Sequence, residues 1–294
     1  MLTTLHTFGG LDGYTPYAGL ALGTDGNFYG TTTSGGDSCS GEYTCGTVFR
    51  ITPGGTLTTL HDFDDSDGAE PLGVLVLGTN GNFYGTTIQG GAAGYGTVFE
   101  ITPKGTLTTV VDFNPDGGGP FGGGPEAGLA LGSDGNFYGT SLYSGCAIGC
   151  GTVFETTPDG VFTNLHTFSG PDGLNPTGGL FQSTGGTFYG TTHEGGRSNN
   201  CRYGCGTLFS LDMGLGPFVS FVRNPAEVGQ AFGILGQGFT GTTSVELNGI
   251  PATFTVVSNT FIKATVPAGA TTGYVTVTTP SGTLTSNVPF RVIP

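Results

Sequence analysis

Residues 27–32 read Asn-Phe-Tyr-Gly-Thr-Thr, and this motif organises most of the chain because it recurs. It returns as NFYGTT at 82–87, as NFYGTS at 136–141 and as TFYGTT at 187–192. Each copy is followed by a segment that reads G-T-V-F or G-T-L-F, beginning at Gly46, Gly96, Gly151 and Gly206. The period is about 50 residues, which is typical of one blade of a β-propeller.

Each repeat unit predicts four β-strands. In the first unit these are an apolar strand at 19–22, the FYGTT motif, GTVFRIT from Gly46 and LTTLHDF from Leu57. The Asp25-Gly26 turn between the first two supplies the positive φ angles of a tight hairpin. No apolar pattern of useful length has the 3.6-residue period of a helix, so we predict an all-β fold.

The strand count predicts how the repeats close. The first, second and third strands of the repeat each occur four times. The fourth strand also occurs four times, but one copy lies at the N-terminus, before the first repeat unit, and no copy follows Leu211 in the last unit. We predict a four-bladed β-propeller over residues 1–213, closed by the N-terminal strand, which completes the last blade and removes exposed edges. The alternative is that this strand completes the last blade of a neighbouring molecule, which gives a fibre. The candidate assembly residues are Leu2, Thr3, Thr4, Leu5, His6, Thr7 and Phe8.

The composition changes after the last repeat, and residues 217–294 predict a second domain. Residues 245–252 form a hairpin pattern around an Asn-Gly turn. Residues 261–266 and 274–278 alternate apolar and polar side chains, as half-buried strands do. Turn signals every 8–12 residues over roughly 80 residues are typical of an immunoglobulin-like β-sandwich.

The six cysteines fall into three local pairs, each in the loop before the G-T-x-F strand of repeats one, three and four. Repeat two has Ala-Ala-Gly-Tyr at 92–95 and lacks both cysteines. Cysteines that are present or missing as a pair indicate a disulfide that closes the loop, whereas a zinc site needs two more ligands nearby. We predict the disulfides Cys39–Cys45, Cys146–Cys150 and Cys201–Cys205, and hence an oxidising, extracellular location.

The charge excludes two classes of partner. The net charge is −14 with only seven Lys and Arg, so the chain lacks the basic surface that nucleic acid requires. The same acidity repels an anionic membrane, and no run of 18 apolar residues predicts a membrane span. Because the sequence opens directly on repeat sequence without a signal peptide, we expect it to be the mature part of a longer precursor.

Histidines are the first candidate metal ligands. His6, His61 and His166 share one position of the fourth strand, where repeat three has Val111. A ring of metal-binding histidines would therefore be incomplete, and His193 stands alone in a loop. We predict structural or solvent-facing roles for these side chains.

The densest acidic cluster lies in the loop between repeats one and two. One interpretation is a calcium site, because calcium prefers carboxylate oxygens. The other is a solvated turn, in which Asp favours tight bends. The spacing of an EF-hand loop is not met, so we expect no bound cofactor. The candidate residues are Asp62, Asp64, Asp65 and Asp67.

The repeated tyrosines invite two interpretations. They form a stacking platform for sugars, or they pack between blades whose faces are both covered, and we predict the second. No nucleophile elbow, Ser-His-Asp order or phosphate-binding loop is present, so we predict that the protein is not an enzyme. The tyrosines are Tyr29, Tyr84, Tyr138 and Tyr189.

Two known families resemble this sequence. Residues 1–213 resemble the GloVer tandem-repeat (choice-of-anchor) extracellular proteins through the pattern [DN]GNFYGTT…GG…GTVF.ITP.G.LTTLH.F. Residues 217–294 resemble an IPT/TIG domain through GxGFTGTTSVELNGIPATF and IKATVPAGATTGYVTVTTPSG. The resemblance implies secreted or surface proteins of bacteria, in which IPT/TIG modules serve interaction or spacing. It carries no catalytic residue over to this chain.

These observations predict a non-enzymatic extracellular structural or adhesive surface protein. We expect it to self-associate, or to bind other surface proteins, as a filament subunit joined head to tail by strand or domain contacts. The alternative is a glycan-binding propeller module that uses loop aromatics such as Tyr14 and Tyr17.

Overall fold

The structure is a computed structural model that describes residues 2–38, 45–114, 123–142, 150–198 and 200–293. These residues contain β-strands and loops but no helix. The chain divides into two compact units. The first comprises Met1–Leu131, Asn136–Phe181 and Gly190–Phe209, and the second comprises Gly132–Gly135, Gln182–Tyr189 and Ser210–Pro294.

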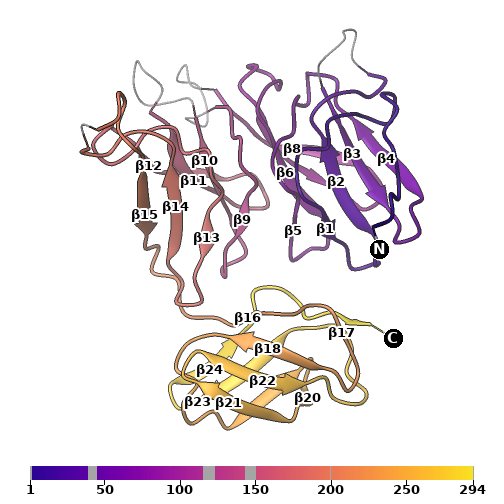
Figure 1. Ribbon diagram of the computed structural model, residues 1–294, viewed down its shortest axis with the longest axis vertical. Helices are drawn as coiled ribbons and strands as arrows, with labels where there is room; N and C mark the ends of the chain where they lie inside the picture. Colours follow the sequence, from indigo (N-terminus) through magenta and orange to yellow (C-terminus); the bar gives the residue numbers. More distant parts are fainter. Residues whose placement is uncertain (1, 39–44, 115–122, 143–149, 199, 294) are drawn as a thin grey trace. The chain divides into compact units, whose positions relative to one another are not determined.

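The first three repeats each form a four-stranded antiparallel sheet with its strands in chain order, which we call blades one to three (Figure 1). Blade one contains β1 (Ala21–Leu22), β2 (Phe28–Thr32), β3 (Thr47–Ile51) and β4 (Leu57–Asp62). Blade two contains β5 (Val76–Leu77), β6 (Phe83–Thr87), β7 (Thr97–Ile101) and β8 (Leu107–Asp112). Blade three contains β9 (Ala130–Leu131), β10 (Phe137–Ser141), β11 (Thr152–Thr156) and β12 (Phe162–Thr167). The four-strand prediction is therefore confirmed for these repeats, although the first strand of each is only two residues long.

The fourth repeat forms a sheet of three strands, which we call blade four. It contains β13 (Phe181–Gln182), β14 (Phe188–Thr192) and β15 (Thr207–Leu211). Within the described residues no strand pairs with the outer edge of β15, and residues 2–9 belong to no strand. The predicted closure by the N-terminal strand is therefore not confirmed. The physical reason is that residues 2–8 contact blade one through side chains and close backbone approach, and form no ladder with β15.

The sheets repeat one another in fine detail. In each of blades one to three the register between the third and fourth strands shifts at the same place, after Val48, Val98 and Val153. Such a β-bulge bends the strand and increases its twist. Because the bulge recurs at equivalent residues, a position in one blade can be compared directly with its equivalents in the others.

The core of the first unit lies between successive blades. Tyr29 and Val48 of blade one are buried in one cluster with Leu75, Phe83 and Phe99 of blade two. The ring of Tyr29 stacks on Phe83 with 4.1 Å between centroids, and the equivalent stack joins Tyr84 and Phe137 at 4.0 Å. The prediction that these tyrosines pack between blades is confirmed for Tyr29 and Tyr84.

The glycine of the FYGTT motif is required by the packing of its own blade. A Cβ atom at Gly85 would clash with Cζ of Phe99 and would lie 2.8 Å from Cδ2 of Leu75. Both neighbours are buried, so neither ring nor side chain has room to move away. We expect Gly85→Ala to lower the free energy of unfolding by about 1–3 kcal/mol, as overpacking does. Urea denaturation checks this, and Gly54→Ala is the control because its Cβ would make only ordinary contact. Equal effects at the two positions would contradict the packing argument.

The described residues of the second unit contain ten further strands, most of them in two four-stranded sheets. The first sheet has the order β16 (Ser220–Phe221), β18 (Ala231–Leu235), β22 (Phe261–Thr265) and β21 (Phe254–Ser258). The second has the order β20 (Ile250–Pro251), β19 (Ser244–Leu247), β23 (Val275–Thr279) and β24 (Gly282–Thr285). A parallel pair joins β17 (Ala226–Glu227) to β25 (Val292–Ile293).

The two four-stranded sheets share one apolar core. Phe232, Ile234 and Ile262 of the first sheet are buried in a single cluster with Val245 and Val277 of the second. Both sheets are antiparallel, buried side chains alternate along β23 as the sequence predicts, and β19 alternates in the same way. The Asn-Gly turn is confirmed, because Asn248 and Gly249 have φ angles of 48° and 78°.

Candidate functional site

The N-terminal segment, residues 2–8, lies against blade one. Its position there is equivalent to that of β4 and Phe63 against blade two. The ring of Phe8 packs edge-on against Phe49 with centroids 5.3 Å apart, and Phe63 packs in the same way against Phe99 at 5.2 Å. Equivalent pairs at 5.3 and 5.2 Å are Phe113 with Phe154 and Phe168 with Phe209. The segment therefore occupies the position of a fourth strand relative to the blade that follows it.

Backbone contacts lead to the same conclusion. A Cβ atom at Gly55 would lie 2.7 Å from the carbonyl oxygen of Leu5, and one at Gly105 would lie 2.5 Å from that of Leu60. Gly160 approaches Val110 in the same way. The turn of each of blades one to three thus touches the fourth-strand position that precedes it, and in blade one that position belongs to the N-terminal segment.

Three histidines connect the fourth-strand position to the loop that follows it. Each Nε2 lies within hydrogen-bond distance of an Asp Oδ2 six residues further on, in the pairs His6–Asp12 (2.6 Å), His61–Asp67 (2.6 Å) and His166–Asp172 (2.8 Å). Burial alone would raise the pKa of Asp12, but hydrogen bonds from the Gly9 N–H and from His6 outweigh it and lower the pKa. These histidines have a structural partner, as the sequence predicts.

The edge of blade four is exposed where its equivalents are buried. Leu208 of β15 is 75% exposed, whereas the equivalent residues Val48, Val98 and Val153 are at most 1% exposed. Tyr189 of β14 is 42% exposed, whereas Tyr29, Tyr84 and Tyr138 are at most 1% exposed. In blades one to three these positions are covered by the blade that follows. Blade four has no following blade in the described chain.

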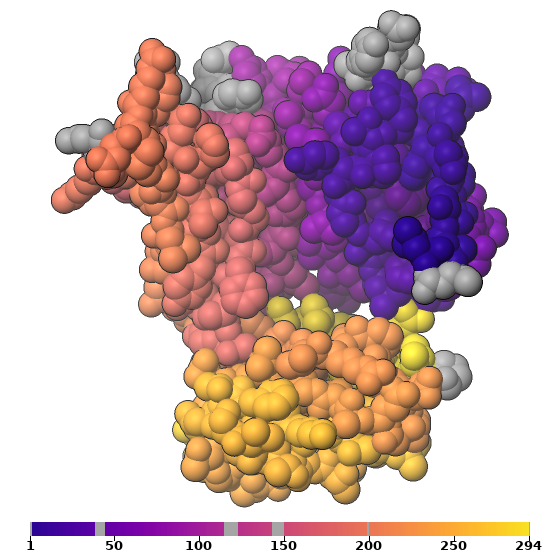
Figure 2. Space-filling model, in the orientation of Figure 1, coloured from indigo at the N-terminus to yellow at the C-terminus, as the bar shows by residue number. Residues whose placement is uncertain are grey.

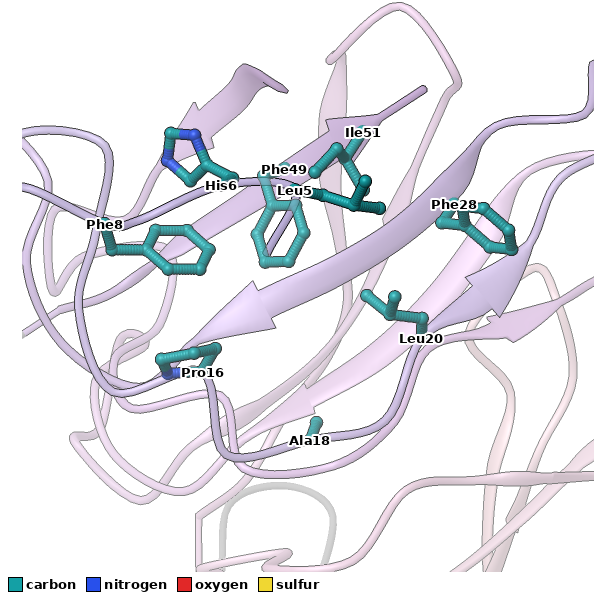
Figure 3. Close-up of a pocket in the computed structure, with 9 residues that line it drawn as sticks. All are labelled: Leu5, His6, Phe8, Pro16, Ala18, Leu20, Phe28, Phe49 and Ile51. Atoms are coloured by element: carbon teal, nitrogen blue, oxygen red, sulfur yellow. The ribbon is translucent and has the colours of Figure 1, made fainter. Parts of the chain in front are cut away.

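Blade one is exposed at the position that a preceding blade covers in the other blades. Leu20 is 54% exposed, whereas its equivalents Leu75, Leu129 and Leu180 are at most 9% exposed. Leu20 lines an apolar pocket of about 470 Å³, which also involves Leu5, Phe8, Phe28, Phe49 and Ile51. Figure 3 shows these side chains converging from the N-terminal segment, β2, β3 and the loop before β1. We call this surface the blade-one pocket.

The structure brings only part of the predicted assembly segment into the pocket. Leu5, His6 and Phe8 line it, whereas Leu2, Thr3, Thr4 and Thr7 are exposed. In Figure 2 the first residues, in the darkest indigo, lie at the surface. Sequence reasoning missed Leu20, Phe28 and Leu208. No signal in the sequence could have identified them, because each is an ordinary member of its repeat and only its exposure differs between blades. Sequence reasoning also predicted that Tyr189 packs between blades, which is wrong for this residue because its side chain is 42% exposed.

The four aspartates considered for calcium do not converge on one point. Asp67 accepts hydrogen bonds from His61 and from the N–H of Asp64, and Asp64 accepts from the N–H and hydroxyl of Ser66. Asp62 differs, because burial raises the pKa of its carboxyl. Asp65 lies at the turn with a φ of 73°. Among the described residues, no three or more His, Cys, Asp or Glu side chains are grouped so that they could hold a metal ion.

A polar cluster surrounds the hydroxyl of Tyr84 in blade two. Oε1 of Glu100 accepts hydrogen bonds from Tyr84 (2.8 Å), Asn80 (2.8 Å) and Asn82 (2.7 Å). Burial and the hydrogen bond to Glu100 raise the pKa of Tyr84 to about 12. Burial would raise the pKa of Glu100, but the three donors outweigh it and lower the pKa. The cluster satisfies its own hydrogen bonds.

The lowered pKa of Glu100 predicts a dependence of stability on pH. A carboxyl whose pKa is lower in the folded state stabilises the protein above its unfolded pKa, near 4.5, and loses this contribution as the pH falls through the folded value. Between about pH 5 and pH 3, the unfolding midpoint of the wild type should fall more steeply than that of Glu100→Gln, which does not titrate. Equal slopes in a series of thermal melts would contradict the assignment.

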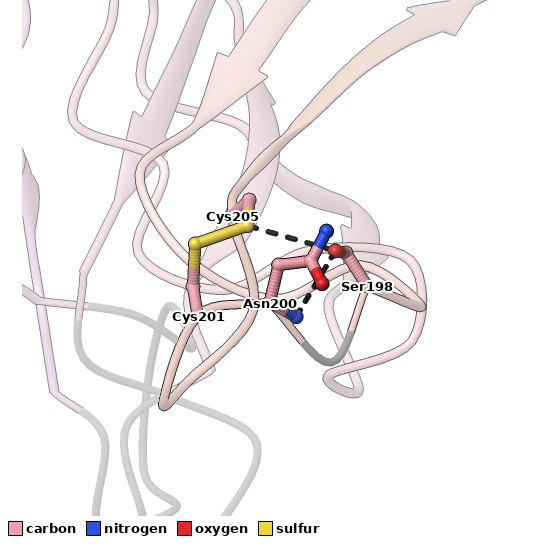
Figure 4. Close-up of a disulfide and its surroundings, with 4 residues drawn as sticks. All are labelled: Ser198, Asn200, Cys201 and Cys205. Atoms are coloured by element: carbon pink, nitrogen blue, oxygen red, sulfur yellow. Dashed lines mark hydrogen bonds between the residues drawn. A yellow bond between two sulfur atoms is a disulfide. The ribbon is translucent and has the colours of Figure 1, made fainter.

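One of the predicted disulfides lies wholly within the described residues. Cys201 and Cys205 are bonded, with 5.4 Å between their Cα atoms, and Ser198 Oγ lies 3.7 Å from the sulfur of Cys205 (Figure 4). Cys45 and Cys150 are also disulfide-bonded. Their expected partners, Cys39 and Cys146, lie outside the described residues.

Comparison with known families identifies both parts of the sequence. The sequence model of the Gloeobacter/Verrucomicrobia repeat matches residues 1–121 and 38–244, and that of the IPT/TIG domain matches residues 218–292. No curated protein matches the sequence. No helix in the described parts of the chain has the length and hydropathy needed to cross a bilayer.

Solved structures offer only distant likenesses. A putative glucose dehydrogenase from Thermus thermophilus is 15% identical with a TM-score of 0.41, and the match covers 95% of each chain. The periplasmic gluconolactonase of Pseudomonas aeruginosa is 14% identical with a TM-score of 0.38, over 94% of this chain and 86% of that one. A fungal alcohol oxidase with copper is 14% identical with a TM-score of 0.37, over 94% and 75%. At these TM-scores the likeness supports no conclusion about activity.

Proposed function

Because the chain belongs to the Gloeobacter/Verrucomicrobia repeat family and carries an IPT/TIG domain at residues 218–292, we propose that it is a non-enzymatic extracellular surface protein that associates head to tail with copies of itself. The repeat region acts as a rigid body pinned by disulfides. The IPT/TIG domain acts as a spacer or a second contact module.

The single observation that supports self-association is that one chain carries two segments with no β-ladder partner among the described residues, the outer edge of β15 and residues 2–8. Blade four ends at β15 with an open edge and an exposed apolar residue, Leu208. Residues 2–8 occupy a fourth-strand position on blade one without belonging to a sheet. An exposed strand edge beside apolar side chains is a template for pairing with another chain. Two different complementary surfaces on one subunit give head-to-tail contacts.

The absence of catalysis is proposed because the carboxyls with a lowered pKa have structural partners and the one with a raised pKa, Asp62, belongs to no group of three or more His, Cys, Asp or Glu side chains that could hold a metal ion among the described residues. The carboxyls with lowered pKa include Asp12, Asp25, Glu100 and Asp172, and each accepts hydrogen bonds from its own repeat unit. A catalytic acid or base usually has a pKa shifted toward neutrality inside a cleft. The extracellular location is supported by the disulfides, which persist in oxidising compartments.

Sedimentation analysis of the intact protein, produced under oxidising conditions, tests this function. The mass should rise with concentration through successive multiples of the subunit, and electron microscopy should find filaments at the highest concentration. A monomer mass at every concentration would overturn the proposed self-association. Labelling of native cells with antibodies tests the location, and labelling that requires permeabilised cells would contradict it.

A glycan-binding module is the second candidate function. The observation in its favour is Tyr17, an exposed aromatic residue in the loop before β1. Exposed aromatic rings offer a flat apolar face of the kind that stacks on sugars. Binding to a glycan array that disappears in Tyr17→Ala would support this candidate over self-association.

A further inference from the structure

The geometry points to a defined docking site between copies, in which the blade-one pocket of one copy receives Leu208 and Tyr189 of a second copy. This inference rests on the proposed self-association and assigns the surfaces that carry it. The argument comes from interfaces already present within the chain, because blades one to three each bury the equivalents of these two residues.

The interface between blades one and two indicates what fills the pocket. There Val48 and Tyr29 of blade one are buried against Leu75, Phe83 and Phe99 of blade two. The residues of blade one that are equivalent to these three are Leu20, Phe28 and Phe49, and all of them line the pocket. In place of Val48 and Tyr29, a second copy would supply Leu208 and Tyr189. Tyr189 should therefore stack on Phe28 as Tyr29 stacks on Phe83.

The strand register follows from the same comparison. In blade one, Val48 of β3 lies opposite His61 of β4. The equivalent residues are Leu208 of β15 and His6 of the N-terminal segment. We expect β15 of the second copy to pair antiparallel with residues 2–8, with Leu208 opposite His6. This pairing satisfies the backbone groups that both edges leave without a ladder.

A side-chain hydrogen bond repeats in the same direction at two of the three blade interfaces, whereas the equivalent hydroxyl of Thr31 in blade one is buried with no partner among the described residues. Thr86 Oγ1 donates to the carbonyl of Ala127 in the next blade (3.0 Å), and Thr140 Oγ1 donates to that of Gly178 (3.3 Å). The equivalent contact between two copies would join Thr191 of the second copy to the carbonyl of Ala18, a residue that lines the pocket. Thr191 is exposed within the chain. The second copy therefore brings a polar contact as well as apolar ones.

A second copy is the occupant because the two surfaces stay apart within one chain. Leu208 and Leu20 are both more than half exposed in the same molecule. If blade four covered blade one of its own chain, both residues would be buried like their equivalents. Each copy carries one pocket and one blade-four edge, so the contact repeats from copy to copy in one direction.

Two variants of the full chain, mixed together, test the docking site. Leu208→Asp disables the blade-four edge, and Leu20→Asp disables the pocket. Each alone should remain a monomer at concentrations where the wild type assembles. An equimolar mixture should form dimers and nothing larger, because each dimer uses the one intact edge and the one intact pocket. Val161→Asp is the control, since Val161 is exposed outside both surfaces and its variant should assemble like the wild type. Circular dichroism and thermal melts verify that all three variants are folded.

The possible failures separate the docking site from the proposed function. If the wild type assembles and both Asp variants assemble equally well, the docking site is overturned while self-association stands, through the IPT/TIG domain or another surface. If both variants are monomers and their mixture stays monomeric, the pairing of this pocket with this edge is overturned. If the wild type itself is a monomer at every concentration, both proposals fail.

Discussion

Val98→Asp should prevent the repeat region from folding, whereas Leu208→Asp should leave it folded. The two residues occupy equivalent positions of the third strand, but Val98 is fully buried and Leu208 is exposed. A carboxylate at Val98 would be buried without a partner, at a cost of several kcal/mol that is comparable to the stability of a whole domain. At Leu208 the carboxylate meets water, so the free energy of unfolding should change by no more than about 0.5 kcal/mol.

Urea denaturation at concentrations where the protein is monomeric measures both effects. The low concentration matters because assembly would itself stabilise the folded state. Comparable losses for the two variants would mean that Leu208 is covered within its own chain. In that case the exposed edge of blade four would not exist in solution.

Tyr84→Ala should lower the free energy of unfolding by about 3–5 kcal/mol, as truncation of buried aromatic residues does. The variant loses the stack on Phe137 at 4.0 Å, and Glu100 loses one of its three donors. Tyr189→Ala is the matched change in blade four, where the side chain is partly exposed, and it should cost about 1 kcal/mol or less. Tyr84→Phe separates the two losses, because it keeps the ring and removes only the hydrogen bond, at a cost of about 1–3 kcal/mol.

Chemical denaturation followed by circular dichroism provides these three values. The repeat region and the IPT/TIG domain contain separate cores, so each transition must be assigned before a free energy is taken from it. Equal losses for Tyr84→Ala and Tyr189→Ala would contradict the assignment of Tyr84 to an interface between blades and of Tyr189 to an open edge.

Much of the fold could be predicted from sequence because the repeats carry local signals. The Asn-Gly and Asp-Gly turns, the alternation within strands and the recurring FYGTT motif all refer to residues close together in the chain. The short first strands were less predictable. β1 extends over only Ala21–Leu22 although the apolar pattern begins at Gly19, because only these two residues pair with β2.

The relation between the ends of the repeat region was the part that sequence could not determine. Counting strands correctly identified that blade four lacks a partner and that residues 2–8 resemble one. Whether the two meet depends on the angle between successive blades, which is set by side-chain packing such as that of Tyr29 on Phe83. No local pattern reports that angle.

The sequence predicted a candidate assembly site at the N-terminal segment, but it did not predict which other residues lie at that site. The sequence pointed to residues 2–8 as the assembly segment, which stays a prediction, and within this segment Leu5, His6 and Phe8 line the blade-one pocket. The other half of the proposed interface, at Leu20 and Leu208, became visible only when the exposure of equivalent residues was compared between blades. The His–Asp pairs also escaped prediction, and for His61 and His166 the reason is that each joins a strand to a loop whose relative orientation depends on the bulge.

Hydrogen exchange of the β15 amides, measured over a range of protein concentrations, tests the open edge and its intermolecular partner most directly. The β15 amides that point away from β14 should exchange rapidly in dilute protein and become protected as the concentration rises, because the outer edge of β15 gains its fourth strand only from another copy. The β7 amides should be protected throughout, since β7 is paired on both sides. Protection of β15 that is already complete in dilute protein would contradict the account, because it would mean that blade four is closed within its own chain.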